Sequence, residues 1–266
     1  MKINPIFQRL ALITGAETLE FFSHIRVIVC GVGGVGSWCA EALVRSGIGS
    51  VDLVDSDTIC ITNVNRQVQA RCCSVGRVKV DELAARLHEI NPQCRIRAYP
   101  KVFSRETAGI FNIEESDYVI DAIDSLSCKL DLIETAAKAG VTLFSSMGMA
   151  QKLDPLRLKT AGIWETSGCP LARLVRSGLR RRGFNSSFLC VYSDERLPLH
   201  TEIAVSCGSA QCMCPVRKNS EDGFGEWCSS KKVINGSAVT VTASAGMILA
   251  SLVIRDLCGK TGKIYG

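Results

Sequence analysis

The sequence predicts an α/β protein built on a Rossmann-like, doubly wound and mostly parallel sheet with a C-terminal α/β appendage. Three observations support this fold class. Short apolar runs alternate with amphipathic segments over residues 26–145, as parallel strands alternate with crossover helices. A glycine-rich turn directly follows the first apolar run. The alternation breaks near residue 150, so we expect the remaining chain to form an appended lobe.

The elements follow from this pattern in order. Residues 6–24 predict one or two short helices, because apolar Leu10, Leu12, Leu19 and Phe22 recur among polar residues. The next expected elements are a strand at 26–30, a helix at 37–46, a strand at 51–54, a loop at 56–75, a helix at 76–90, a strand near 94–99, a helix near 104–112, a strand at 117–121, a helix at 127–139 and a strand at 141–145. The C-terminal part adds strands near 156–163 and 188–193, a helix at 170–182, a loop at 194–235 and a final helix.

The glycine-rich turn carries a nucleotide-binding pattern. Gly31, Gly33 and Gly36 form a G-x-G-x-x-G sequence between a strand and a helical segment, the context that this pattern requires. Glycines let the backbone approach phosphates, which then lie at a helix N-terminus. Asp55 ends the next strand about 20 residues later, where a carboxylate can accept from ribose hydroxyls. The pattern therefore predicts a nucleotide site, and alone it favours NAD or FAD.

The polar segment after Asp55 favours a different nucleotide. Asn63, Asn65, Arg66 and Lys79 are donors suited to phosphate oxygens, and Arg66 can hold them through two hydrogen bonds. A dehydrogenase needs no such set directed at a polyphosphate. An enzyme that expels pyrophosphate does need it, because negative charge builds on those oxygens in the transition state.

Several separated motifs resemble the ubiquitin-activating-enzyme superfamily of ATP-dependent adenylating enzymes, which includes the activators of molybdopterin and thiamine sulfur carriers. The resemblance extends from about residue 6 to about residue 258. The matching strings are Gly31–Ser37, Asp55–Asp57, Asn63–Gln67, Val75–Lys79, Ile90–Pro92 and Asp121–Asp124. The resemblance implies ATP and Mg²⁺ as cofactors, and it leaves room for a monovalent cation.

This resemblance also implies roles for individual residues. Arg66 and Lys79 would bind the phosphates and favour pyrophosphate departure, and Asp124 would lie near Mg²⁺ and the α-phosphate; these three are the implied catalytic residues. Arg9 resembles an arginine that reaches the ATP of a partner subunit, which implies a homodimer. Ser125 is a departure, because many sulfur-carrier activators have asparagine there. The implied ATP-binding set is Arg9, Gly31, Gly33, Gly34, Gly36, Asp55, Asp57, Asn63, Asn65, Arg66, Gln67, Lys79, Asp124 and Ser125.

Within this superfamily the chain resembles the tRNA threonylcarbamoyladenosine dehydratases. The matching segments are Arg9–Gly15, Val119–Ser125, Leu153–Pro155, Cys169–Arg180 and Val191–Glu195. That family adenylates the side-chain carboxylate of threonylcarbamoyladenosine in tRNA, and the activated acyl carbon then cyclises with net loss of water. Cys169 is a departure, because members commonly have aspartate before the Pro-Leu pair.

The composition describes a soluble globular chain. Of its 266 residues, 47% are hydrophobic and 21% are charged, which allows a large core. No signal-peptide pattern is apparent, so we expect a cytoplasmic protein. The longest apolar stretch, Val239–Ile254, is short for a membrane span and rich in Ser, Thr and Ala. We therefore expect a buried helix there and no membrane partner.

A cluster of arginines indicates a surface for RNA more specifically than the net charge of +5 does. Apolar Leu171, Leu174, Val175 and Leu179 recur at helical spacing, so the arginines between them lie on or near the outer face of a helix. Charge alone is equally consistent with a solvated helix face. With the family resemblance we expect contacts to tRNA phosphates. The candidate tRNA-binding residues are Arg173, Arg176, Arg180, Arg181 and Arg182.

Fourteen cysteines are many for an intracellular chain, and most lie in apolar segments that suit small buried side chains. Cys207, Cys212, Cys214 and Cys228 stand apart in a Gly/Ser-rich loop at 206–232. Four thiolates can bind zinc, but this spacing lacks the paired C-x-x-C ligands that zinc sites usually have. Zinc and redox roles are therefore disfavoured. A loop thiolate could also accept an acyl group, and no motif selects one of the four.

We predict an ATP-dependent dehydratase that cyclises N6-threonylcarbamoyladenosine in tRNA through an acyl-adenylate. One alternative is an adenylyltransferase that activates the C-terminus of a ubiquitin-like sulfur carrier, with a sulfur-relay or ubiquitin-like protein as partner. Another is an NAD-dependent oxidoreductase, and a third is a non-catalytic nucleotide-binding module. Residues 1–150 would form the ATP-binding adenylation domain with the N-terminal helices. Residues 151–266 would form a lobe for substrate and dimerisation.

Overall fold

Apart from the helix expected near 104–112, the helices and strands of the described residues occur in the predicted order. A computed structural model describes residues 3–198 and 236–262. The strands are β1 (Arg26–Cys30), β2 (Ser50–Val54), β3 (Arg95–Tyr99), β4 (Tyr118–Asp121), β5 (Thr142–Ser146), β6 (Leu158–Gly162) and β7 (Leu189–Ser193). The helices are α1 (Gln8–Thr14), α2 (Ala16–His24), α3 (Gly36–Arg45), α4 (Lys79–Ile90), α5 (Leu126–Lys138), α6 (Pro170–Arg181) and α8 (Val239–Lys260).

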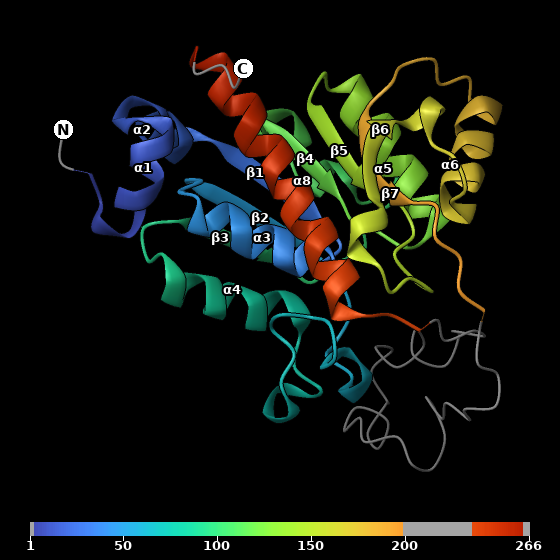
Figure 1. Cartoon of the computed structure of the whole chain (residues 1–266), viewed down its shortest axis with the longest axis horizontal. Coiled ribbons are helices and arrows are strands. Elements are labelled where there is room, and N and C mark those ends of the chain that lie inside the picture. Colours follow the sequence, from blue (N-terminus) through green and yellow to red (C-terminus); the bar gives the residue numbers. More distant parts are fainter. Residues whose placement is uncertain (1–2, 199–235, 263–266) are drawn as a thin grey trace.

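All seven strands belong to one sheet, in the order β3-β2-β1-β4-β5-β7-β6 (Figure 1). β6 is antiparallel to β7, and the other neighbouring strands are parallel. This arrangement confirms the predicted Rossmann-like, doubly wound fold. In the described part of the chain, residues on both sides of position 150 contribute strands to this sheet, and the division into two domains stays a prediction.

Helices cover both faces of the sheet. Successive side chains of a strand point to opposite faces, so one strand contributes to the core on each side. Val27 and Val29 of β1 join one buried cluster with residues of α2, α3, α4 and α8. Ile28 and Cys30 join the other cluster, which includes residues of α5 and α6. A central strand that is buried on both faces is expected to be continuously apolar. The segment Arg26–Cys30 is apolar at every position after Arg26.

The strand order reverses between β1 and β4. From β1 the chain proceeds to β2 and β3 on one side, and then returns to β4 and β5 on the other. Such a switch point opens a crevice at the carboxyl ends of the two strands, where ligands of doubly wound folds bind. The glycine turn after β1 and the segment after β4 therefore border the same crevice.

Two local predictions need correction. The helix expected near 104–112 is replaced by short 3-10 turns at Ala108–Ile110 and Ile113–Glu115. Asn112 adopts a left-handed conformation with φ of 45°, which ends helical geometry there. The helix expected from residue 76 begins at Lys79, because Gly76 has φ of 88° and Val78 forms an antiparallel bridge with Thr58.

The final helix, α8, extends beyond the predicted 239–254. By length and composition it could cross a membrane. Half of its most apolar window is buried within the protein, where Val241, Ala245, Leu249 and Val253 join the core. Figure 1 shows α8 lying along α3 on one side of the sheet. Packing in the core accounts for the apolar composition of this helix.

Gly246 sets the distance between α8 and α3, and we expect Gly246→Ala to lower the free energy of unfolding by about 1–3 kcal/mol. An added Cβ would lie 2.5 Å from the Val35 backbone oxygen and 2.9 Å from the Cys39 backbone nitrogen. Gly259 of the same helix has no atom within 4 Å of such a Cβ, so Gly259→Ala should leave stability unchanged or raise it by up to about 1 kcal/mol. Urea unfolding of both variants checks this, and equal stabilities would contradict it.

Candidate nucleotide site

The glycine turn after β1 is held so close to neighbouring backbone that side chains are excluded. Gly31 has φ of 87°, and a Cβ there would lie 2.6 Å from the Ala122 backbone oxygen. A Cβ at Gly36 would overlap the Gly31 carbonyl oxygen. Gly33 and Gly34 instead face the segment after β2, beside the side chains of Gln67 and Arg66. The four glycines thus give a bare backbone at the switch point, which is the surface that phosphates approach.

Asp55, at the carboxyl end of β2, is tied to this turn. Its two carboxylate oxygens accept from the backbone N–H groups of Val32 and Asp57, each at 2.9 Å. Burial raises the pKa of the Asp55 carboxyl above its usual value, against the opposing charge of Lys79. The predicted ribose-binding residue therefore also orders the turn that it borders.

Lys79 begins α4 and lies against both acids of the Asp55–Asp57 segment. Its side chain is only 6% exposed, and its ammonium donates to Asp57 at 2.6 Å, with Asp55 at 3.9 Å. Burial alone lowers the pKa of an ammonium, but the two carboxylates outweigh burial and raise the pKa of Lys79. Lys79 is therefore a positive charge at neutral pH, aimed at the crevice beside the ribose-side acid.

Arg66 brings a second positive charge to the same place. Its guanidinium donates to the Thr62 backbone oxygen at 2.8 Å and to the Asn65 side chain at 3.0 Å. Burial lowers the pKa of Arg66, while the charge of Asp124 opposes that shift. Asp124 also interacts electrostatically with Lys79. The three residues predicted to be catalytic are thus brought together around the glycine turn.

The remaining polar residues of this segment divide into structural and available groups. The Asn63 side chain accepts from the Cys60 backbone N–H at 3.0 Å and so fixes the turn before Arg66. Asn65 donates to the Ser237 backbone oxygen at 2.9 Å, just before α8. The Gln67 side-chain oxygen is buried without a partner among the described residues, in a side chain that lies beside Gly33. An orphaned acceptor next to a bare turn fits a ligand with hydroxyl or amino donors, as a nucleotide has.

A buried ion pair beneath the site was not predicted from the sequence. Lys129 of α5 and Asp121 of β4 are both fully buried, with nitrogen and oxygen 2.6 Å apart. Ser145 donates to the same Asp121 oxygen at 2.5 Å, and Lys129 donates to the Ser146 backbone oxygen at 2.9 Å. The other Asp121 oxygen accepts from the Ile123 N–H at 3.1 Å. This network orders the segment that leads to the exposed Asp124 and to Ser125, the residue before α5.

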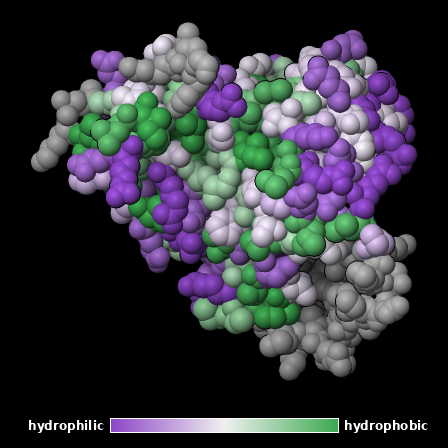
Figure 2. Space-filling model, viewed as in Figure 1, coloured by the Kyte–Doolittle hydropathy of each residue, from purple (hydrophilic) through white to green (hydrophobic). Residues whose placement is uncertain are grey.

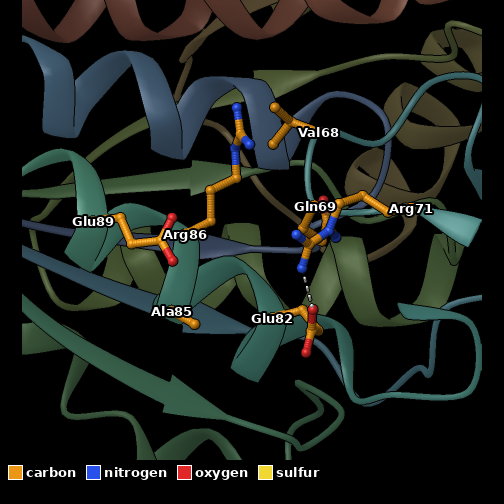
Figure 3. Close-up of a pocket in the computed structure, with 7 residues that line it drawn as sticks. All are labelled: Val68, Gln69, Arg71, Glu82, Ala85, Arg86 and Glu89. Carbon is orange, nitrogen blue, oxygen red and sulfur yellow. Dashed lines mark hydrogen bonds and ion pairs between the residues drawn. The ribbon is translucent and has the colours of Figure 1, made fainter. Parts of the chain in front are cut away.

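Two other residues also support the site without a recognisable motif. Trp38 donates its indole N–H to the Arg66 backbone oxygen at 2.9 Å. Gln69 donates to the Val32 backbone oxygen at 2.9 Å, and so connects the glycine turn to the segment that follows it. A small cavity of about 50 Å³ lies behind this connection, lined by Gln69, Arg71, Arg86 and their neighbours (Figure 3). It is too small for a nucleotide and lies apart from Arg66, Lys79 and Asp124.

Arg9 is not part of this site within one chain. It is exposed on α1, and the neighbouring Phe7 lies against Gly47, before the start of β2. Asn4 donates to Gln93, just before β3. The segment that carries Arg9 therefore lies at the amino end of the sheet, opposite the nucleotide crevice.

The arginine-rich helix, α6, covers the far side of the sheet beside β7. Arg182 is paired with Asp131 and Glu134 of α5, Arg180 lies 5.4 Å above the Trp164 ring, and Arg176 donates to the Thr166 hydroxyl. Arg173 and Arg181 are exposed, and within the described ranges they make no ion pair. Figure 2 shows hydrophilic side chains gathered over this end of the molecule.

The cysteines proposed as zinc ligands, Cys207, Cys212, Cys214 and Cys228, lie outside the described residues. Across residues 3–198 and 236–262, no group of three or more His, Cys, Asp or Glu side chains is placed to hold a metal. A metal that accompanies a nucleotide needs fewer protein ligands, because phosphate oxygens supply part of its coordination. The exposed carboxylate of Asp124 fits that requirement.

The fold and the crevice are those of a nucleotide-binding α/β protein. Residues 7–265 match the ThiF family, so the chain belongs to that family. It is 38% identical over 252 residues to the tRNA threonylcarbamoyladenosine dehydratase of Bacillus subtilis, with 94% of each chain covered. It is 31% identical over 265 residues to the enzyme of that name from Escherichia coli, with 95% of this chain and 93% of the relative covered.

Solved structures agree with the sequence relatives. The Escherichia coli tRNA N6-threonylcarbamoyladenosine dehydratase in complex with ATP superposes with a TM-score of 0.81 at 28% identity, covering 100% of both chains. The same protein in complex with AMP gives a TM-score of 0.80 at 29% identity, covering 99% of this chain and 100% of that one. The resemblance inferred from the motifs is therefore confirmed over nearly the whole chain.

Breaking the buried ion pair should destabilise the protein, and we expect Lys129→Met to lower the free energy of unfolding by about 3–5 kcal/mol. The substitution leaves the Asp121 carboxylate buried without its countercharge. Lys138→Met changes an exposed lysine of the same helix and should have an effect within about 0.5 kcal/mol. Chemical denaturation of the two variants measures the difference, and similar losses in both would contradict the assignment.

Proposed function

We propose that the chain is an ATP-dependent enzyme that dehydrates N6-threonylcarbamoyladenosine in tRNA, forming the cyclic product with release of AMP and pyrophosphate. The observation that carries this proposal is the convergence of Arg66, Lys79 and Asp124 on the glycine turn. Nearly full-length similarity to dehydratases of that name supports it. The similarity favours this reading over a sulfur-carrier activator or an NAD-dependent oxidoreductase.

The first chemical step forms an acyl-adenylate. A carboxylate oxygen of the modified nucleoside attacks the α-phosphate of ATP, and the bond to the departing pyrophosphate breaks. Arg66 and Lys79 hold the phosphate oxygens on which charge accumulates, and the glycine turn contributes backbone N–H groups. Asp55 accepts from the ribose hydroxyls and thereby fixes the adenosine side of the substrate.

Mg²⁺ would be held at Asp124 together with phosphate oxygens of ATP, where it neutralises charge on the leaving group. Asp124 suits this role because it is exposed at the crevice and because Lys129 and Asp121 order the segment that carries it. Gln67, Asn65, Asp57 and Ser125 complete the set of residues that we assign to nucleotide binding.

The second step closes the ring within the substrate. A nucleophile of the same nucleoside attacks the activated acyl carbon, AMP departs with the former carboxylate oxygen, and a proton is released. Both ends of the new bond belong to one substrate, so holding them in place supplies much of the rate enhancement. A protein thiol is not required by this stoichiometry.

We further infer a homodimer in which Arg9 serves the site of the second subunit. Arg9 is exposed at the amino end of the sheet, so it cannot reach the crevice of its own chain. Exposed Leu12 and Ile13 on the same helix supply apolar surface for such an association. These features support the dimer as a proposal.

The decisive test is the mass of nucleosides from threonylcarbamoylated tRNA incubated with protein, ATP and Mg²⁺. We expect an ATP-dependent loss of one water from the nucleoside, and Arg66→Ala should lower its rate by about 10²-fold or more, as for other losses of transition-state charge stabilisation. Arg95→Ala removes an exposed arginine at the amino end of the sheet and should retain activity.

A chain that leaves the nucleoside unchanged, and releases AMP only when a ubiquitin-like protein is supplied, would overturn the proposal. Equal rates in Arg66→Ala and Arg95→Ala would leave the function intact but would remove Arg66 from the site. Gentle work-up is needed, because water reopens an activated ring.

For the tRNA contacts, we expect Arg173→Ala and Arg181→Ala each to weaken tRNA binding and to lower the slope of log affinity against log salt by about 1. Both side chains are exposed and free of ion pairs in the described part of the chain. Arg182→Ala is the matched control, because Arg182 is already engaged by Asp131 and Glu134. Binding measured at several salt concentrations tests the assignment, and unchanged slopes in all three variants would exclude α6 as the phosphate-binding surface.

A further inference from the structure

We propose that Cys72 and Cys73 form a dithiol site for trivalent arsenicals, and that its occupation weakens nucleotide binding at the neighbouring glycine turn. Among the cysteines of residues 3–198 and 236–262, these two are the exposed ones; Cys60 and Cys128 are half-buried and the others are buried. The exposed thiols of the described residues are therefore adjacent in sequence. The coupling to the nucleotide rests on the function proposed above, whereas the dithiol site does not.

The chemistry of adjacent thiols favours a bridging atom over a direct disulfide. Consecutive Cα atoms are about 3.8 Å apart, whereas the two Cα atoms of a disulfide are usually about 4.4–6.8 Å apart. One arsenic atom bound to both sulfurs spans the difference. In this reaction an organic arsenoxide and two thiols give one dithioarsenite and one water, with no change in oxidation state.

Binding through both thiols must change the local backbone. Cys72, Cys73 and Ser74 form a short 3-10 helix. Consecutive side chains of such a helix point about 120° apart, because it has about 3 residues per turn. Bringing both sulfurs to one atom therefore requires this turn to change shape.

The residues on either side of the turn are paired with α4. Arg71 and Arg77, on either side of the turn, donate to the two oxygens of Glu82 on α4 at 3.1 and 2.9 Å. Figure 3 shows the side chain of Arg71 meeting Glu82 beside Gln69. The Arg77 charge also interacts with the Cys73 thiol.

A chain of hydrogen bonds leads from this turn to the nucleotide crevice. Ser74 is fully buried and accepts from the Arg71 N–H at 2.9 Å, and its hydroxyl lies within donating distance of the backbone oxygens of Arg71, at 3.0 Å, and Gln69, at 3.3 Å. The Gln69 side chain then donates to the Val32 backbone oxygen within the glycine turn, at 2.9 Å. The side-chain oxygen of Gln69 is buried without a partner among the described residues. A shift of Ser74 therefore moves Gln69, whose side chain ties this segment to Val32.

The dithiol is tested with phenylarsine oxide on the full chain carrying serine at Cys207, Cys212, Cys214 and Cys228. Trypsin cleaves after Arg71 and Arg77, so one peptide, Cys72–Arg77, reports both thiols. We expect one phenylarsenic group on this peptide that survives excess monothiol and is removed by dithiothreitol. Cys72→Ser in the same background leaves one thiol and should lose the group to the monothiol. Retention by Cys72→Ser, or no adduct on the peptide, would overturn the site.

The coupling is tested by ATP affinity before and after treatment, with thermal unfolding as a check that the treated chain stays folded. We expect a loss of about fivefold or more, the lower range of couplings between sites, and saturating ATP should slow the labelling reciprocally. The Cys72→Ser, Cys73→Ser chain should bind ATP equally well with and without the reagent. An adduct with unchanged ATP affinity overturns the coupling. An untreated chain that fails to bind ATP contradicts the proposed function, and the peptide masses still decide the dithiol.

Discussion

The glycine turn after β1 and the segment after β4 touch through their backbones, and the site depends on that contact. Ala122 donates to the Cys30 carbonyl at 2.8 Å, and its oxygen leaves no room for a Cβ at Gly31. Because β1 and β4 are the strands at which the sheet order reverses, this contact closes the base of the crevice. The backbone of the glycine turn, to which we assign phosphate binding, and the carboxylate of Asp124 are thereby held on two sides of one opening.

A buried ion pair, Asp121 with Lys129, holds the segment after β4 in this contact. Asp121 and Lys129 are removed from water at the carboxyl end of β4, which costs hydration free energy. Ser145 and the Ser146 carbonyl satisfy their remaining hydrogen bonds. A buried pair of this kind contributes little net stability compared with apolar side chains of equal size, but it has one well-defined geometry. Asp121 also accepts from the Ile123 N–H group, so the ion pair orders the segment that carries Asp124.

The parts of this structure that sequence could predict are those encoded locally. The glycine spacing, the acid after β2 and the alternation of apolar runs each depend on neighbours within a few residues, and the fold class followed from them. Lys129, Trp38 and Gln69 could not be assigned in this way, because their partners come from other elements. The missed turns near 104–112 show the same limit. Phe103 and Phe111 are buried against each other, with ring centroids 5.3 Å apart. That tertiary packing overrides a local helical pattern.

The two cations of the crevice have different partners, and the difference bears on the phosphate contacts that we propose for them. Lys79 donates to a carboxylate 2.6 Å away, so its charge is already compensated at short range. Arg66 donates to two neutral acceptors, the Thr62 carbonyl and the Asn65 side chain. Exchanging neutral acceptors for phosphate oxygens gives the Arg66 guanidinium a negatively charged partner that it can hold through two hydrogen bonds. Exchanging the Asp57 carboxylate gains less. We therefore expect Arg66 to gain more than Lys79 when charge moves onto the departing pyrophosphate, because Lys79 is already paired with Asp57.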